Sequence, residues 1–192
     1  MPVPNIYPAN FYPVKETKDI WNLIIRTGFE QWNVVALFNW SEKENKKIVL
    51  EAKTLGLMEN KEYLLYEFWT DEFCGSFAKT RELLLPIQSC LLLAIREKKN
   101  HPQVISVNRH LTQDAVSLSG VIWSQKNLLL SGRSEVPGNF DYIITIHIPG
   151  RYKVKSVFSD AGEINFRKFN SGIVKVVIKC LEKSTVNWKI NF

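Results

Sequence analysis

Acid catalysis on sugars is the first chemistry to consider, because the chain carries nineteen acidic residues. A glycoside hydrolase needs two carboxylates held at a fixed separation across the scissile bond. Most of the acids stand instead in polar segments typical of turns: Glu42, Glu44, Glu59, Glu62, Asp71, Glu72, Glu97, Asp160 and Glu163. This distribution predicts solvated charges and no catalytic residue.

Histidines and cysteines also lack the spacing that chemistry requires. The histidines are His101, His110 and His147, and no pair has the spacing of metal ligands. The three cysteines form no C-x-x-C pair, so we expect no metal and no cofactor. We interpret the cysteines as small side chains of the core, and a Cys74–Cys180 or Cys90–Cys180 disulfide remains an alternative. The sequence has no nucleophile elbow and no glycine-rich phosphate loop. The triplet at residues 39–41 matches the short N-glycosylation pattern.

Tryptophans offer a different chemistry, because an indole ring can stack on a sugar. Trp32, Trp40 and Trp188 fall on the apolar faces of predicted strands, which favours core packing. Trp69 stands beside the polar segment 70–72, with aromatic neighbours, and is the candidate carbohydrate-binding residue. Trp21, Trp69 and Trp123 are all less constrained by their neighbours.

Charge and length exclude several classes of protein. The 192 residues carry a net charge of +6, and the positive residues are spread without a run, so we expect no nucleic-acid partner. The densest apolar stretch, residues 83–95, is interrupted by Pro86 and is shorter than the about 20 residues a membrane helix needs, so no membrane partner is expected. Residues 1–15 lack the pattern of a secretory signal, which leaves the localisation open. A catalytic (β/α)₈ barrel of about 250 residues does not fit the length.

The elements that must position these side chains are strands. Residues 32–40 alternate so that one face carries Trp32 and Trp40 and the other carries Val35 and Leu37, as in a central strand covered on both sides. Further apolar runs, punctuated by Gly and Pro, occur at 48–50, 63–69, 83–85, 90–95, 116–118, 121–123, 127–130, 142–148, 152–157, 173–178 and 186–192. This pattern predicts an all-β protein.

A polar segment at residues 96–102, which ends in proline, predicts a linker. It divides the chain into two domains, 1–98 and 99–192. For each we expect an antiparallel, Greek-key-like β-sandwich.

Four segments resemble, in order, the C-terminal β-domains of melibiase-type glycoside hydrolases, the α-galactosidase superfamily. Residues 32–41 resemble the opening strand of that domain. Residues 63–73 resemble its Y-x-x-x-D-F-W-x-x-x-F segment, with Glu67 in place of the aspartate, and residues 85–96 its L-P-x-x-S-C-x-L-L-x-x-R strand. Residues 101–113 resemble the start of a further β-domain found in a bacterial subset.

The resemblance implies a part of such a protein that carries no catalytic residue. In that superfamily two aspartates of the barrel do the chemistry, and residues 18–23 resemble the point where the chain leaves the barrel. The implied function is a non-catalytic accessory module whose partner is a catalytic barrel domain, or a second copy through an apolar face. The alternative is a carbohydrate-binding module that contacts galactose-containing glycans through surface aromatics such as Trp69. An independent enzyme would need a clustered acid pair or a His–carboxylate group.

Overall fold

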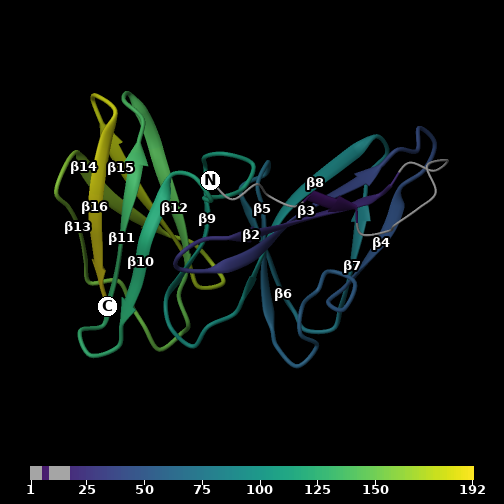
Figure 1. Cartoon of the computed structure of the whole chain (residues 1–192), viewed down its shortest axis with the longest axis horizontal. Helices are drawn as coiled ribbons and strands as arrows, with labels where there is room; N and C mark the ends of the chain where they lie inside the picture. Colours follow the sequence, from purple (N-terminus) through teal and green to yellow (C-terminus); the bar gives the residue numbers. More distant parts are fainter. Residues whose placement is uncertain (1–5, 9–17) are drawn as a thin grey trace. The chain divides into compact units, whose positions relative to one another are not determined.

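The computed structural model describes residues 6–8 and 18–192, and these residues form strands and no helix. The predicted all-β class is therefore confirmed (Figure 1). Most of residues 1–15, considered above for a secretory signal, lie outside the described residues. Within the described part of the chain, no helix exists that could cross a membrane.

The chain divides into two compact units. Unit 1 runs to Ile25 and resumes over Gln31–Lys98, whereas unit 2 contains Arg26–Glu30 and Lys99–Phe192. The strands of unit 1 are β1 (Ile6–Pro8), β2 (Ile20–Arg26), β3 (Gln31–Asn39), β4 (Lys46–Glu51), β5 (Tyr63–Glu67), β6 (Glu72–Phe77), β7 (Thr80–Leu85) and β8 (Ser89–Glu97). Those of unit 2 are β9 (Gln103–Val107), β10 (Leu118–Ser124), β11 (Leu129–Val136), β12 (Phe140–His147), β13 (Ser156–Ser159), β14 (Glu163–Lys168), β15 (Ile173–Cys180) and β16 (Ser184–Asn191).

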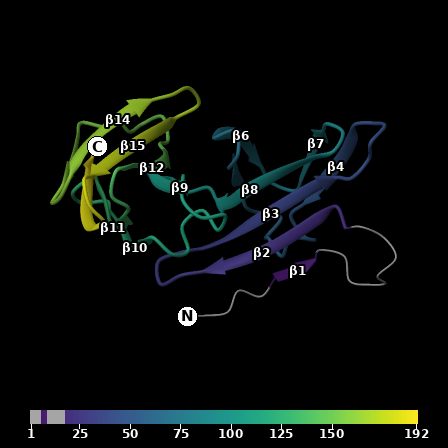
Figure 2. The same cartoon turned by 90° about the horizontal axis from the view of Figure 1, so that it is seen from above.

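Unit 1 packs a two-stranded sheet, β4-β7, against a six-stranded sheet in the order β1-β2-β3-β8-β5-β6 (Figure 2). Strand alternation places alternate residues of the large sheet in the core between the two sheets. Val35 and Leu37 of β3 point into this core together with Leu93 of the neighbouring strand β8. Ile48 and Leu50 of β4 close this core from the other layer.

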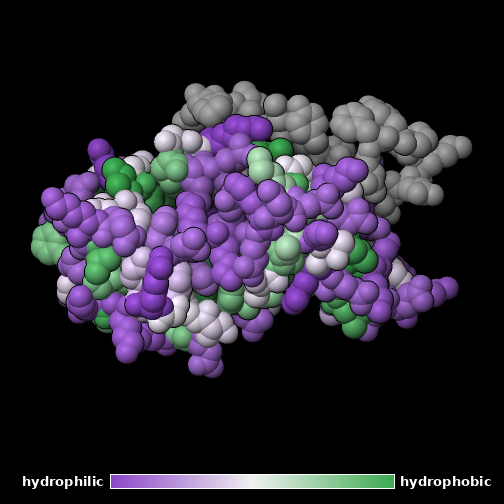
Figure 3. All heavy atoms as spheres, turned by 90° about the horizontal axis from the view of Figure 1, so that it is seen from below, coloured by the Kyte–Doolittle hydropathy of each residue, from purple (hydrophilic) through white to green (hydrophobic). Residues whose placement is uncertain are grey.

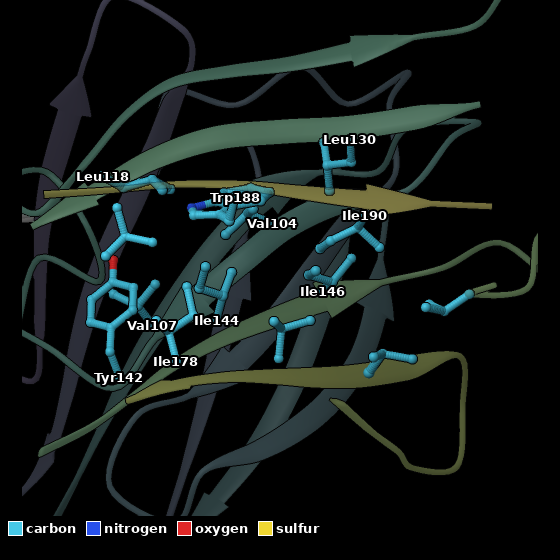
Figure 4. Packing of buried hydrophobic residues seen from close by; sticks show 14 of the residues in the cluster. Val104, Val107, Leu118, Leu130, Tyr142, Ile144, Ile146, Ile178, Trp188 and Ile190 are labelled. Carbon is cyan, nitrogen blue, oxygen red and sulfur yellow. The ribbon is translucent and has the colours of Figure 1, made fainter. Parts of the chain in front are cut away.

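Unit 2 is a sandwich of two four-stranded antiparallel sheets, β10-β11-β16-β13 and β14-β15-β12-β9. In Figure 4 the side chains of Leu130 and Trp188 from one sheet face those of Ile144 and Ile146 from the other. Trp188 is fully buried because its ring lies over Gly132: a Cβ added there would come within 2.4 Å of Trp188 Cζ2. The indole Nε1–H donates to Ser134 Oγ at 3.0 Å, which satisfies the one polar atom of the ring.

The predicted linker is wrong at its start. Arg96 belongs to β8 and is 1% exposed, with its guanidinium carbon 3.8 Å from the ring centroid of Trp32. A weakly hydrated guanidinium stacked on an indole can enter a core where an ammonium group could not. Only residues 98–102 connect β8 to β9.

The surface is mixed in character. On the face drawn in Figure 3, hydrophobic residues occur in small patches among hydrophilic ones. Single exposed apolar side chains of this kind are normal for a folded protein.

Candidate functional site

The turn between β5 and β6 carries Trp69, whose side chain is 58% exposed. Its ring stands edge-on against Phe68, with 5.2 Å between ring centroids and an interplanar angle of 76°. Phe68 continues the sheet, because its backbone N–H donates to Leu92 O at 2.9 Å. The exposed indole therefore belongs to a residue that directly follows the end of an internal strand of the sheet.

A buried carboxylate fixes this turn. Glu67 is 2% exposed, and its Oε2 accepts hydrogen bonds from Thr70 N at 2.6 Å and Thr70 Oγ1 at 2.9 Å. Its Oε1 accepts the backbone N–H of Leu92 at 3.0 Å. Glu67 thus joins the turn to β8, and the charge-assisted bonds are stronger than neutral ones.

A second contact closes the other side of the turn. The hydroxyl of Tyr66 donates to Asp71 Oδ1 at 2.5 Å and lies 2.9 Å from Asp71 O. Asp71 has a φ of +57°, a left-handed conformation that aspartate tolerates better than most residues. The position of Trp69 is therefore set by its neighbours on both sides.

Cys74 lies on β6, the strand that follows this turn. Burial raises the pKa of its thiol, and the negative charges of Glu67 and Glu72 raise it further. A thiol with a raised pKa is mostly protonated near neutral pH and is a weak nucleophile. The turn consequently offers stacking and hydrogen bonding, but no activated nucleophile.

Further aromatic side chains lie on one face of the six-stranded sheet. Asn22 and Asn33 are joined by a hydrogen bond and both donate to Leu55 O on the core side, so Trp21 of β2 points to the opposite face. Phe38 of β3 lies on that opposite face as well, since Leu37 points into the core.

Trp40 stacks on Phe38, with 4.8 Å between centroids and an interplanar angle of 13°, and its Nε1–H donates to Lys18 O at 3.3 Å. Residues opposite each other in a sheet share a face. Ala36 is opposite Leu92, and the bond from Phe68 N to Leu92 O extends this register, so Phe68 lies on the same face. Trp69 stands beyond the ladder and joins this set through the contact of its ring with that of Phe68. We call the set Trp21, Phe38, Trp40, Phe68 and Trp69 the aromatic face.

The structure corrects the core assignment of one tryptophan. Trp32 and Trp188 are buried as predicted, at 1% and 0% exposure, but Trp40 is 51% exposed. β3 ends at Asn39, so Trp40 lies beyond the ladder, where alternation no longer buries a side chain. Trp21 is 40% exposed, and Trp123 is half-buried against the stacked ring of His101.

Two other predictions need correction or restriction. The cysteines are free thiols, and Cys90 is exposed rather than part of a core. Asn39 of the glycosylation pattern is 2% exposed, and its Nδ2 donates to Leu85 O and Pro86 O at 3.2 and 2.7 Å. A glycan on that nitrogen is incompatible with this fold.

Two of the three histidines pack within unit 2, and the third lies in an exposed turn. His101 stacks on Trp123 with 5.3 Å between centroids, His110 is exposed in a turn, and His147 is buried in β12. The described residues include no cluster of three or more His, Cys, Asp or Glu side chains placed to hold a metal ion.

Sequence reasoning missed Glu67 as the residue that fixes the turn. A glutamate inside the apolar run 63–69 was the available signal. In comparisons with known proteins, no family model and no curated protein matched the sequence.

Proposed function

We propose that this chain is a non-catalytic accessory module of a glycoside-hydrolase-like protein related to the melibiase-type enzymes. One observation carries the proposal: each of the three resembling segments of unit 1 contains a buried polar or charged residue with a structural role. Asn39 holds the segment at Pro86, Glu67 holds the Trp69 turn, and Arg96 stacks on Trp32. A shared framework of this kind is what related β-modules have in common, whatever they bind.

The distribution of acids supports a role without catalysis. Glu67 and Asp114 are the buried acidic residues in the described part of the chain, and they belong to different units. Each is engaged with its own neighbours: Glu67 with Thr70, and Asp114 with Ser117, whose hydroxyl donates to Asp114 Oδ1 at 2.7 Å. Both buried carboxylates thus have structural hydrogen-bond partners in their own unit, which supports a role without a catalytic pair. The module would therefore act beside a catalytic barrel domain as its partner.

The experiment is a hydrolysis assay of the purified chain with aryl α-galactosides and aryl β-galactosides. We expect no release of the phenol above the blank, whereas a melibiase-type enzyme assayed in parallel gives turnover. Hydrolysis that persists through two independent purification schemes would refute the proposal. Sequencing the DNA upstream of this reading frame is the complementary observation, since a frame encoding a barrel with paired aspartates supports the assignment.

A carbohydrate-binding module is the second candidate, and the exposure of Trp69 on a fixed turn favours it. A carbohydrate-binding module must bind a sugar through its own surface, whereas an accessory module need not bind one.

A further inference from the structure

We propose that the aromatic face binds an oligosaccharide, with Trp21, Trp40 and Trp69 as the stacking residues. This inference goes beyond the accessory role, since it names a ligand class and a surface. It does not depend on kinship with glycosidases, and it extends the site from the single tryptophan that the sequence indicated.

The exposed area of the aromatic face comes from flat rings. Trp21, Trp40 and Trp69 are 40%, 51% and 58% exposed, whereas the large aliphatic side chains Val34 and Leu92 on the same face are 5% and 8% exposed. Exposed indoles over buried aliphatics suit the C–H faces of sugar rings, which carry partial positive charge toward the negative face of the indole.

Two of these rings are held in place without a ligand. Trp40 is stacked on Phe38 on one side and hydrogen-bonded to Lys18 O, which leaves its other side as the stacking surface. Trp69 is set by Phe68 and by the bonds of Glu67 to Thr70. Binding then requires little further ordering of side chains, which is a main cost of association.

The extent of the face indicates an oligosaccharide rather than a single sugar. Trp21 lies on β2 and Phe68 at the end of β5, with β3 and β8 between them in the sheet. Three strand spacings of about 4.8 Å give a width of about 14 Å. Thr70 and Asp71, in the turn that carries Trp69, are exposed at one end and supply polar groups for sugar hydroxyls.

Charge argues against a nucleic acid, whose bases also stack on tryptophan. Single-strand binding combines aromatic platforms with a positively charged groove. Asp71 lies in the same turn as Trp69 and is exposed, so its carboxylate would repel phosphates at this end of the face.

The test is isothermal titration of the full chain with a panel of probes: cellohexaose, mannohexaose, xylohexaose and stachyose, with oligo-dT as the nucleic-acid arm. We expect binding of at least one oligosaccharide. The substitutions Trp40→Ala and Trp69→Ala should each weaken it about tenfold, the upper end of what one aromatic contact contributes. Leu84→Ala, which removes a 60% exposed side chain from β7 of the same unit, should leave the affinity unchanged.

A chemical arm avoids any effect of substitution on folding. Cys90 is exposed and lies opposite Phe38 in the sheet, hence on the aromatic face, whereas Cys180 is buried. Cys74 is also a free thiol and only half-buried, so both arms use a Cys74→Ser background. Alkylation of Cys90 with a bulky maleimide should then abolish binding, and the further Cys90→Ser change should leave binding intact in the presence of the reagent.

The proposal is overturned by three results. Any one of them suffices: no heat of binding with any oligosaccharide, the same affinity in the two tryptophan variants as in the wild type, or binding of oligo-dT and of no sugar. A dimer that Trp40→Ala dissociates in sedimentation velocity, without sugar binding, would assign the face to a second copy instead.

Discussion

Replacement of Glu67 by glutamine tests whether one buried carboxylate holds the Trp69 turn. The wild-type side chain accepts three hydrogen bonds, two from Thr70 and one from Leu92 N. Glutamine keeps the shape but turns one acceptor oxygen into a donor. At either position this NH₂ group would face a backbone N–H, because one oxygen meets Leu92 N and the other meets Thr70 N.

The expected loss follows from those contacts. A hydrogen bond to a charged group contributes about 1.5–3 kcal/mol, and a buried donor left without an acceptor costs about 1–3 kcal/mol. At least one bond is lost and the others become neutral, so we expect unit 1 to lose about 2–4 kcal/mol of unfolding free energy. Glu72→Gln is the matched control, because Glu72 is opposite Glu67 in the β5–β6 ladder but is exposed.

Two measurements check this prediction. Urea unfolding followed by tryptophan fluorescence gives the free energy, and amide hydrogen exchange gives the local effect at Thr70 and Leu92. Both amides should lose protection in Glu67→Gln and keep it in Glu72→Gln. A change below about 0.5 kcal/mol, the range of ordinary surface substitutions, together with unchanged exchange would refute the reasoning.

Two further predictions concern unit 2. Gly132→Ala should destabilise it by about 1–3 kcal/mol or more, since the new Cβ would meet the fully buried Trp188 ring, whereas Gly150→Ala, with open space around it, should be tolerated in thermal unfolding. Hydrogen bonds from the Asn187 side chain and backbone lower the pKa of the Asp160 carboxyl, so its contribution to stability is present at neutral pH and is lost as the pH falls through that lowered pKa. Asn187→Ala should raise the pKa of Asp160 in an NMR titration, and an unchanged value would contradict this origin.

The prediction of strands succeeded where alternation was clear and failed where polar residues entered the ladder. Residues 32–40, which are apolar on both faces, correspond to β3, and residues 186–192, which have one apolar face, correspond to β16. β2, β6, β9 and β14 were not predicted: β6 and β14 carry few apolar residues, and β2 and β9 are apolar without strict alternation. Arg96 was placed in a linker because its charge suggests water, and only its stack on Trp32 reveals why it is buried.

In the candidate site, too, some features could be predicted from the sequence and others could not. The exposure of Trp69 could be expected because it borders a polar turn. The assignment of Trp40 to the core was wrong, since the end of β3 at Asn39 is a property of pairing rather than of composition. The aromatic face joins residues from β2 to the end of β5. Its members are brought together by sheet order, which a single sequence does not encode in any local pattern.

The sequence by itself determined the all-β class, because side-chain alternation with period two is a local property of strands. It also determined which residues are aromatic and where turns interrupt them. Tertiary structure decided which of these residues share a face and which are exposed, because sheet register and packing depend on partners far along the chain. The buried bonds of Glu67 and the exposure of Trp40 follow from that long-range pairing.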